Sequence, residues 1–251
     1  MPNIPNGRPF RLQTLLNACL ALLMLTAVGS VQAAIPAQER AVLVALYEST
    51  HGAGWTNNKG WLGAAGTECS WFGVDCRSTG DGVSVAIAER VISIQLIKNN
   101  LIGTLPVTLN NLTALQFFDV DNNQLSGSIP ALSGLTKLWG FYVGNNQLSG
   151  SIPVLRGLTA LQNFHVGNNQ LSGSIPVLSG LTALQFFSVI HNQLSGSIPA
   201  LSGLIALQGF YVGNNQLSGS IPVLSGLTAL QNFHVGNNQL SGSIPVLSGL
   251  T

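Results

Sequence analysis

The sequence is short of charged residues. Only 7% of its 251 residues are Asp, Glu, Lys or Arg, whereas a typical soluble protein has roughly 25%. All eight carboxylate side chains lie at or before Asp121, and no Asp, Glu, Lys or Arg follows Arg156. A protein that binds nucleic acid needs clustered Lys and Arg to displace phosphate counterions. The sequence therefore predicts no nucleic-acid partner.

The N-terminus has the layout of an export signal. Two arginines precede an apolar run, Leu12–Val31, which ends in the small-residue pattern "VQA". This order is typical of a secretory signal peptide cleaved near Ala33. The alternative is a retained membrane anchor, since the run approaches the roughly 20 residues that span a bilayer. We predict a signal peptide over residues 1–33 and a secreted, periplasmic or cell-surface location, with membrane contact only through an uncleaved signal segment.

Cysteine is scarce as well, which limits cross-links and metal sites. Cys19 lies in the apolar N-terminal run, so the mature chain would keep only Cys69 and Cys76, in the segment "CSWFGVDC". A pair close in sequence, in a chain directed to an oxidising compartment, predicts one disulfide. Zinc would need two more ligands, which His51 alone does not supply. We predict no metal and no cofactor.

Repetition is what the sequence has in abundance. Six consecutive units of 23 residues run from Leu112 to Gly249, and a slightly longer unit precedes them at Ala88–Asn111. A fixed period in this range predicts a solenoid. We predict an N-terminal cap over residues 34–87, then seven repeat units and a truncated eighth over residues 88–251.

Each unit has the same core and turn residues. In the unit "LTALQNFHVGNNQLSGSIPVLSG", Phe164 and Val166 alternate with polar or small residues, which predicts a half-buried strand with His165 pointing outward. Asn169 follows the strand, where its amide can satisfy backbone groups of its own and the neighbouring coil. The Gly and Pro of "LSGSIP" exclude a long regular helix on the return path.

These segments resemble the plant-type leucine-rich repeat, whose signature is "N-x-L-S-G-x-I-P", shortened here by one residue after the Pro. Upstream, "AQERAVLVALYEST", "GW" and "CSWFGVDC" resemble the N-terminal cap of receptor-kinase ectodomains, polygalacturonase-inhibiting proteins and related bacterial secreted proteins. The resemblance implies an α/β solenoid. In such a right-handed superhelix a parallel sheet lines a concave binding face, the convex side is irregular or 3-10, and a helical cap covers the N-terminal end. It implies no catalysis.

A cap at the N-terminal end is also expected on physical grounds, independently of the resemblance. The segment Glu39–Thr50 places apolar residues on one helical face that can cover the open end of the first repeat. Three tryptophans of the cap are predicted to pack this cover. The apolar residues of the helix are Val42, Leu43, Leu46 and Tyr47, and the tryptophans are Trp55, Trp61 and Trp71.

The array contains a copied block of three units. Leu112–Gly180 and Leu181–Gly249 differ at only seven positions. The core positions do not differ, whereas the differences Asp119/Ser188, Asp121/Ile190 and Asn122/His191 fall on outward positions of the strand or at its end. A solenoid can lengthen in this way because each coil contacts only its neighbours.

The outward columns of the strands form the candidate binding site. Exposed aromatic side chains beside amides suit recognition by stacking and hydrogen bonding. The residues predicted to bind a ligand on the concave face are Phe117, Asp119, Asp121, Tyr142, Asn163, His165, Phe186, Ser188, His191, Tyr211, Asn232 and His234.

We predict no catalytic residue. The repeats beyond Asp121 contain three histidines and no acid to orient them. His165 and His234 lie three coils apart, which is roughly 14 Å at 4.8 Å per strand, too far to share a metal ion. Asp119 and Asp121, with Lys137 and Tyr142 nearby, indicate a local polar patch.

The function that we predict is that of a secreted or surface-displayed module that binds a protein through its concave face. A neutral cell-wall carbohydrate is the alternative, favoured by the uncharged, amide-rich surface. Adhesion to an ordered lattice such as ice is a further alternative that a ladder of Asn and Ser could serve. Because the sequence stops two residues into another unit without a polar cap, it also predicts end-to-end self-association or a fragment of a longer array.

Overall fold

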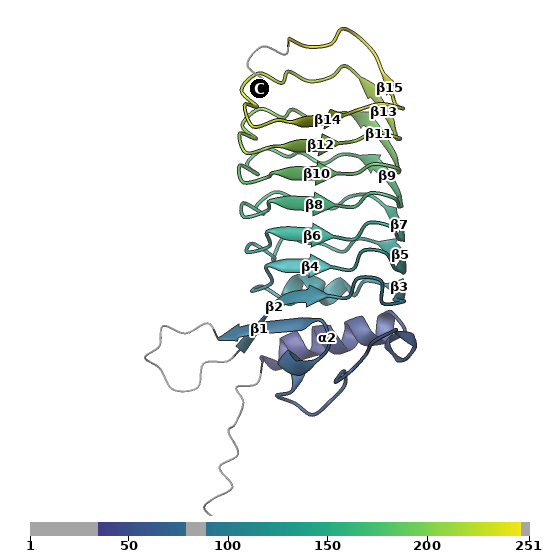
Figure 1. Ribbon diagram of the computed structural model, residues 1–251, viewed down its shortest axis with the longest axis vertical. Helices are drawn as coiled ribbons and strands as arrows, with labels where there is room; N and C mark the ends of the chain where they lie inside the picture. Colours follow the sequence, from purple (N-terminus) through teal and green to yellow (C-terminus); the bar gives the residue numbers. More distant parts are fainter. Residues whose placement is uncertain (1–34, 79–88, 247–251) are drawn as a thin grey trace, which may run out of the picture. The chain divides into compact units, whose positions relative to one another are not determined.

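The computed structural model describes residues 35–78 and 89–246, which form a cap followed by stacked coils (Figure 1). The predicted signal peptide and the final "LSGLT" from residue 247 onward lie outside the described residues, as do residues 79–88. Among the described residues, no helix is both long and apolar enough to cross a bilayer. The predicted fold class, a solenoid with parallel sheets and a helical cap, is confirmed.

The cap is built around one amphipathic helix, α2 (Ala37–Ser49), whose Val42, Leu43 and Leu46 are buried as predicted. Trp55, Trp61 and Trp71 are buried as well, so their predicted packing role is confirmed. The remaining cap elements are η1 (Gly52–Gly54), η2 (Glu68–Ser70) and β1 (Val74–Ser78). The predicted disulfide is present, and it joins η2 to β1 through Cys69 and Cys76, with 5.4 Å between the Cα atoms.

Eight strands form the first sheet, in the order β1-β2-β4-β6-β8-β10-β12-β14. β1 pairs antiparallel with β2, and every later pair is parallel. Equivalent positions of successive repeats are direct partners, as in Tyr142 opposite His165 and His165 opposite Ser188. The strands are β2 (Glu89–Gln95), β4 (Phe117–Asp119), β6 (Gly140–Tyr142), β8 (Asn163–His165), β10 (Phe186–Ser188), β12 (Gly209–Tyr211) and β14 (Asn232–His234).

A second parallel sheet lies on the return path, built from the "QLSG" segments and, in the first repeat, from "IGT". The prediction of an irregular convex side did not include this sheet. The predicted lack of a long helix on the return path is confirmed for residues 89–246. Gly and Ser have little intrinsic preference for strands. These segments form strands here because each one pairs with the same segment of the next coil. A 3-10 helix, η3 (Val107–Asn111), occurs in the first repeat. The strands are β3 (Ile102–Thr104), β5 (Gln124–Ser128), β7 (Gln147–Gly150), β9 (Gln170–Ser174), β11 (Gln193–Ser197), β13 (Gln216–Gly219) and β15 (Gln239–Leu240).

The core between the two sheets is a set of columns of identical side chains. One column is a stack of phenylalanine rings from Phe118 to Phe233, with neighbouring centroids 5.5–5.7 Å apart and ring planes 13–16° from parallel. The leucine and valine columns beside it are buried through the middle of the array. Each coil therefore buries its apolar residues against the equivalent residues of its neighbours, as a solenoid requires.

The recurring asparagine ties the coils together, as predicted. Asn169 donates from Nδ2 to the carbonyl oxygens of Val166 and Gly167 in its own coil and of Val143 in the preceding coil, at 3.0–3.3 Å. Its Oδ1 accepts the backbone N–H of Leu148 at 2.8 Å. The equivalents at Asn146, Asn192, Asn215 and Asn238 repeat this pattern.

Substituting Asn169 by Ala should therefore weaken the array at its centre. The change leaves three carbonyls and one N–H without this partner, and we expect a loss of about 2–4 kcal/mol in the free energy of unfolding. Asn168→Gly is the matched control, because Asn168 is exposed and has a positive φ of 54° that Gly adopts freely. Urea denaturation measures both. Equal effects of the two substitutions would contradict the role assigned to the Asn169 amide.

Candidate functional site

The predicted site residues lie along the outer face of the first sheet, the face predicted to be concave. The in-register pairing aligns Asp119, Tyr142, His165, Ser188, Tyr211 and His234 in one column. Phe117, Asn163, Phe186 and Asn232 lie in the column before it. His191 differs from the rest, because it lies in the turn after β10 with a positive φ of 51° and belongs to the row of turn residues.

Two residues that were expected to be free of the core are buried. Asp119 is 8% exposed and Ser188 is 9% exposed. Both side chains are short, and parallel register places a bulky residue beside each of them: Tyr142 beside Asp119, and His165 and Tyr211 on the two sides of Ser188. Neighbouring strands are about 4.8 Å apart, so these larger side chains cover the shorter ones.

An acid does orient a histidine on this face, which the sequence analysis did not foresee. The Asp121 carboxylate lies 3.1 Å from Nδ1 of His165, two coils further along, and also accepts the backbone N–H of Gly144 in the coil between. A Cβ atom at Gly144 would lie 2.6 Å from Cε1 and 2.8 Å from Nδ1 of the His165 ring. The absence of a side chain at Gly144 is therefore what lets the imidazole reach the carboxylate, and that glycine was the available signal in the sequence.

The copied block lacks this acid. Ile190 occupies the position of Asp121, and its Cγ1 lies so close to Gly167 that a Cβ there would be 2.9 Å away. His234, the equivalent of His165, stacks on Tyr211 with centroids 5.1 Å apart and an interplanar angle of 26°. In the first block the Tyr142 and His165 rings are 6.2 Å apart and tilted by 50°. The two histidines thus have the same strand position and different surroundings.

Burial and neighbouring charge raise the pKa of two groups here. Burial raises the pKa of Asp119 from 3.8 to about 6; the N–H bond from Asp121 opposes this rise, the Asp121 charge adds to it, and His165 lowers it. Burial, followed by the charges of Asp119 and Asp121, also raises the pKa of the Tyr142 phenol. Tyr142 therefore presents a neutral O–H group to the face.

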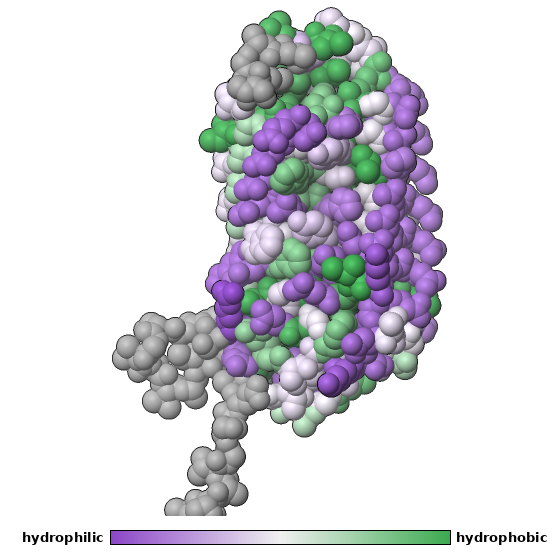
Figure 2. All heavy atoms as spheres, viewed as in Figure 1, coloured by the Kyte–Doolittle hydropathy of each residue, from purple (hydrophilic) through white to green (hydrophobic). Residues whose placement is uncertain are grey.

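A hollow of about 450 Å³ lies over β6, β8, β10 and β12. Its walls are mainly aromatic and aliphatic, with Ser188 as a short residue among them. The lining residues are Tyr142, Asn163, Phe164, His165, Phe186, Ser188, Ile190 and Tyr211. Figure 2 shows apolar and polar side chains mixed over the first sheet, whereas hydrophilic side chains gather along the edge beside the second sheet. A concave apolar surface with a few polar groups is the usual character of a ligand site.

Two further hollows lie elsewhere. One of about 330 Å³ is at the cap end of the first sheet, lined in part by Asp75, Arg77, Phe117 and Trp139. Another, of about 710 Å³, is on the return path between Val154 and Gly180. The latter is the largest of the three, but it contains no aromatic or histidine side chain that could stack on a ligand.

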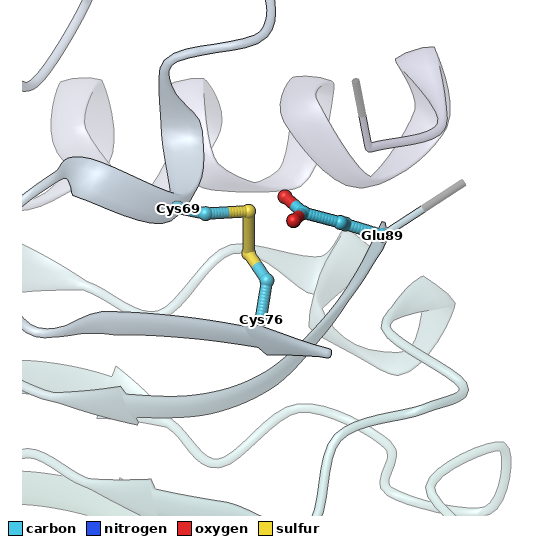
Figure 3. A group of neighbouring side chains, drawn as sticks. All are labelled: Cys69, Cys76 and Glu89. Atoms are coloured by element: carbon cyan, nitrogen blue, oxygen red, sulfur yellow. A yellow bond between two sulfur atoms is a disulfide. The ribbon is translucent and has the colours of Figure 1, made fainter. Parts of the chain in front are cut away.

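One cluster, formed by two cap residues and Glu89 of β2, contains residue types that can bind a metal, but its two cysteines are joined in a disulfide. Ligand atoms of Cys69, Cys76 and Glu89 lie within 4.8 Å of one another, and the Glu89 carboxylate faces the disulfide (Figure 3). Cysteine binds metals as a thiolate, and both sulfur atoms are bonded to each other. No other group of three such ligands occurs within residues 35–78 and 89–246.

Comparison with known proteins gives relatives of one kind. The Leucine Rich Repeat family profile matches residues 114–135. Protein STRUBBELIG-RECEPTOR FAMILY 1 from Arabidopsis thaliana is 40% identical over 74 residues, which is 29% of this chain and 8% of that protein. The chain therefore spans a small part of that relative.

Two solved structures from Arabidopsis thaliana extend the likeness over most of the chain. The leucine-rich-repeat ectodomain of the receptor kinase GASSHO1/SCHENGEN3, crystallised with CASPARIAN STRIP INTEGRITY FACTOR 2, is 31% identical with a TM-score of 0.73; the match covers 82% of this chain and 25% of that one. A chain of the BIR3–SERK2 complex is 31% identical with a TM-score of 0.53, and the match covers 70% of this chain and 94% of that one.

The buried carboxylate makes stability depend on pH. Because the pKa of Asp119 is about 6 in the folded protein and about 3.9 in an unfolded chain, the folded state binds more protons between these values. The contribution of this group to stability therefore falls as pH rises from about 4 to 6. We expect Asp119→Asn to raise the free energy of unfolding by about 2 kcal/mol above pH 6 and to leave it unchanged below pH 4.

Urea denaturation at pH 4 and pH 7.5, followed by tryptophan fluorescence, measures this difference. Ser188→Asp is the matched variant, since it places a carboxylate at the equivalent buried position of the second block and should introduce a loss of stability in the same direction as pH rises. If the free energies of unfolding of Asp119→Asn and wild type differ by the same amount at both pH values, the raised pKa assigned to Asp119 would be contradicted.

Proposed function

The chain belongs to the plant-type leucine-rich-repeat family, and on that premise we propose that it is a secreted or surface-displayed recognition module that binds a protein partner through the outer face of the first sheet. The observation that carries this proposal is the aromatic-walled hollow on that face. It lies on a parallel sheet whose strands are fixed by their neighbours on both sides, so a ligand meets a surface that is already formed.

The relatives support a protein as the ligand. The GASSHO1/SCHENGEN3 ectodomain was crystallised with CASPARIAN STRIP INTEGRITY FACTOR 2, and BIR3 was crystallised in a complex with SERK2. In both cases the matched chain was crystallised with a named partner. The two tyrosines of the face, Tyr142 and Tyr211, also suit a protein partner, because Tyr is enriched among the residues that contribute most to the energetics of protein interfaces.

A neutral carbohydrate is the second candidate, supported by the row of turn residues. In this row Asn237 donates to the Oδ1 of Asn214 at 2.7 Å, and Asn145 and Asn168 are exposed at the equivalent positions. A line of amides, interrupted only by His191 between Asn145 and Asn237, is suited to sugar hydroxyl groups. A glycan array with the mature chain tests this candidate directly.

The proposal predicts that affinity depends on three side chains of the face. Peptides selected from a displayed library on the immobilised mature chain would serve as ligands. Replacing Tyr142, His165 and Tyr211 together by Ala should weaken their binding at least about tenfold, because these side chains surround the hollow. The melting temperature should change little, since none of the three belongs to the buried core.

The matched control replaces Val154, Val177 and Val223 by Ser on the return path, where they are 68–69% exposed. This control should retain affinity, as measured by surface plasmon resonance. Equal losses in the two triple variants would count against a site on the first sheet, and failure to select any peptide would count against a protein ligand.

A further inference from the structure

His165 lines the hollow, and its contact with Asp121 fixes which of its ring nitrogens can accept a hydrogen bond. We propose that Asp121 is a positioning residue that holds the His165 ring with Nε2 as an acceptor, so that the hollow takes a tyrosine or tryptophan side chain of the partner, bonded through its O–H or N–H. This inference rests on the proposed function, because it names the side chain that a protein ligand would insert.

The hydrogen bonds around Asp121 assign the tautomer of His165. An ionised carboxylate only accepts hydrogen bonds, so Nδ1 is the donor in the 3.1 Å contact with Asp121 Oδ2. The other carboxylate oxygen accepts the backbone N–H of Gly144, which holds the carboxylate in place. In a neutral imidazole the proton on Nδ1 leaves Nε2 as the acceptor.

The acceptor nitrogen is open to a ligand. The His165 imidazole has no hydrogen bond besides the one to Asp121 within the described part of the chain. A Cβ atom at Gly167 would lie 3.6 Å from Nε2 and 2.9 Å from Ile190 Cγ1, so residue 167 places no side chain over this nitrogen and Ile190 fills part of the gap. The His165 side chain is 29% exposed. His165 itself lines the hollow.

The shape and chemistry of the hollow select an amphipathic aromatic ring. The apolar walls on which a ring can stack are formed by Tyr142, Phe186, Ile190 and Tyr211. A buried Tyr or Trp ring also requires a partner for its O–H or N–H, and Nε2 of His165 supplies it. Phenylalanine fits the same walls but leaves that nitrogen without a hydrogen bond, which costs affinity.

The copied block provides an internal comparison. His234 has the same strand position, the same preceding tyrosine and the same glycine pattern, but Ile190 replaces the acid. It stacks on Tyr211 and makes no hydrogen bond to a carboxylate within the described residues. Of these two equivalent histidines, only His165 therefore has its tautomer fixed by a carboxylate, and the seven differences between the blocks include the residue responsible.

Substituting Asp121 by Asn should reverse the role of His165 and not merely weaken it. The Asn oxygen can still accept from Gly144, while its NH₂ group would donate to Nδ1, so that Nε2 carries the proton. Nitrogen-15 NMR of histidine-labelled mature chain at pH 7.5 reads the tautomer directly. We expect a proton on Nδ1 of His165 in the wild type and on Nε2 in Asp121→Asn, with His234 unchanged.

Binding is tested with N-acetyl amides of tyrosine, tryptophan and phenylalanine as probes, followed by the same histidine signals. In the wild type the tyrosine and tryptophan probes should bind about five- to tenfold more tightly than the phenylalanine probe and shift Nε2 of His165. Asp121→Asn should reduce this preference to within about twofold while the phenylalanine probe still binds. Ile190→Asp is the reciprocal variant and should give His234 the Nδ1 tautomer.

The outcomes separate this inference from the proposed function. The proposal that the hollow takes a tyrosine or tryptophan bonded to His165 would be overturned by either of two results. One is equal affinity of the three probes in the wild type, and the other is a preference that survives Asp121→Asn. If library-selected peptides still bound the face in that case, the recognition function would stand. If Ile190→Asp gives His234 the predicted tautomer, it supports the positioning role even where Asp121→Asn folds poorly; an unchanged His234 would oppose that role.

Discussion

The asparagine amide at the end of each first-sheet strand is the interaction on which the rest of the structure depends. It is bonded to backbone groups of two successive coils, as Asn169 is bonded to Val143, Val166 and Leu148. Without it, the sharp turn out of the first sheet would leave carbonyl and N–H groups buried without partners, at a cost of about 1–3 kcal/mol each. With it, every coil has the same height and the same register as the coil before it.

That register converts a linear repeat into columns. Positions 23 residues apart become direct neighbours, so the phenylalanines stack in the core and the outward residues line up on the face. Stability is then shared among many equivalent interfaces, and a substitution on the face changes the surface while the core stays the same. The copied block shows this separation, because its seven differences leave the Phe, Val and Asn columns intact.

The glycine positions of the face determine which contacts reach beyond the next coil. Gly144 and Gly167 leave gaps in the column that follows the strands, and the side chains of His165 and Ile190 lean into these gaps. The gap at Gly144 holds the acid–histidine pair, and the gap at Gly167 holds the aliphatic side chain of Ile190 from the second block. The hollow lies where the two blocks meet, lined by both His165 and Ile190. Two nearly identical blocks can therefore form one site with unlike walls, which suits a ligand that binds in a single orientation.

The sequence by itself determined everything that depends on period. The 23-residue repeat and the Leu-x-x-Phe-x-Val alternation specified the solenoid, the inward side of each strand and the role of Asn169, and the cysteine spacing predicted the disulfide that joins Cys69 to Cys76. The tertiary structure decided the rest: the second sheet, the burial of Asp119 and Ser188, and the pairing of Asp121 with His165. The physical reason is that periodicity shows which way a side chain points, whereas burial depends on the volumes of neighbours in adjacent coils. A contact across two coils depends further on how far a ring leans over the glycine between them.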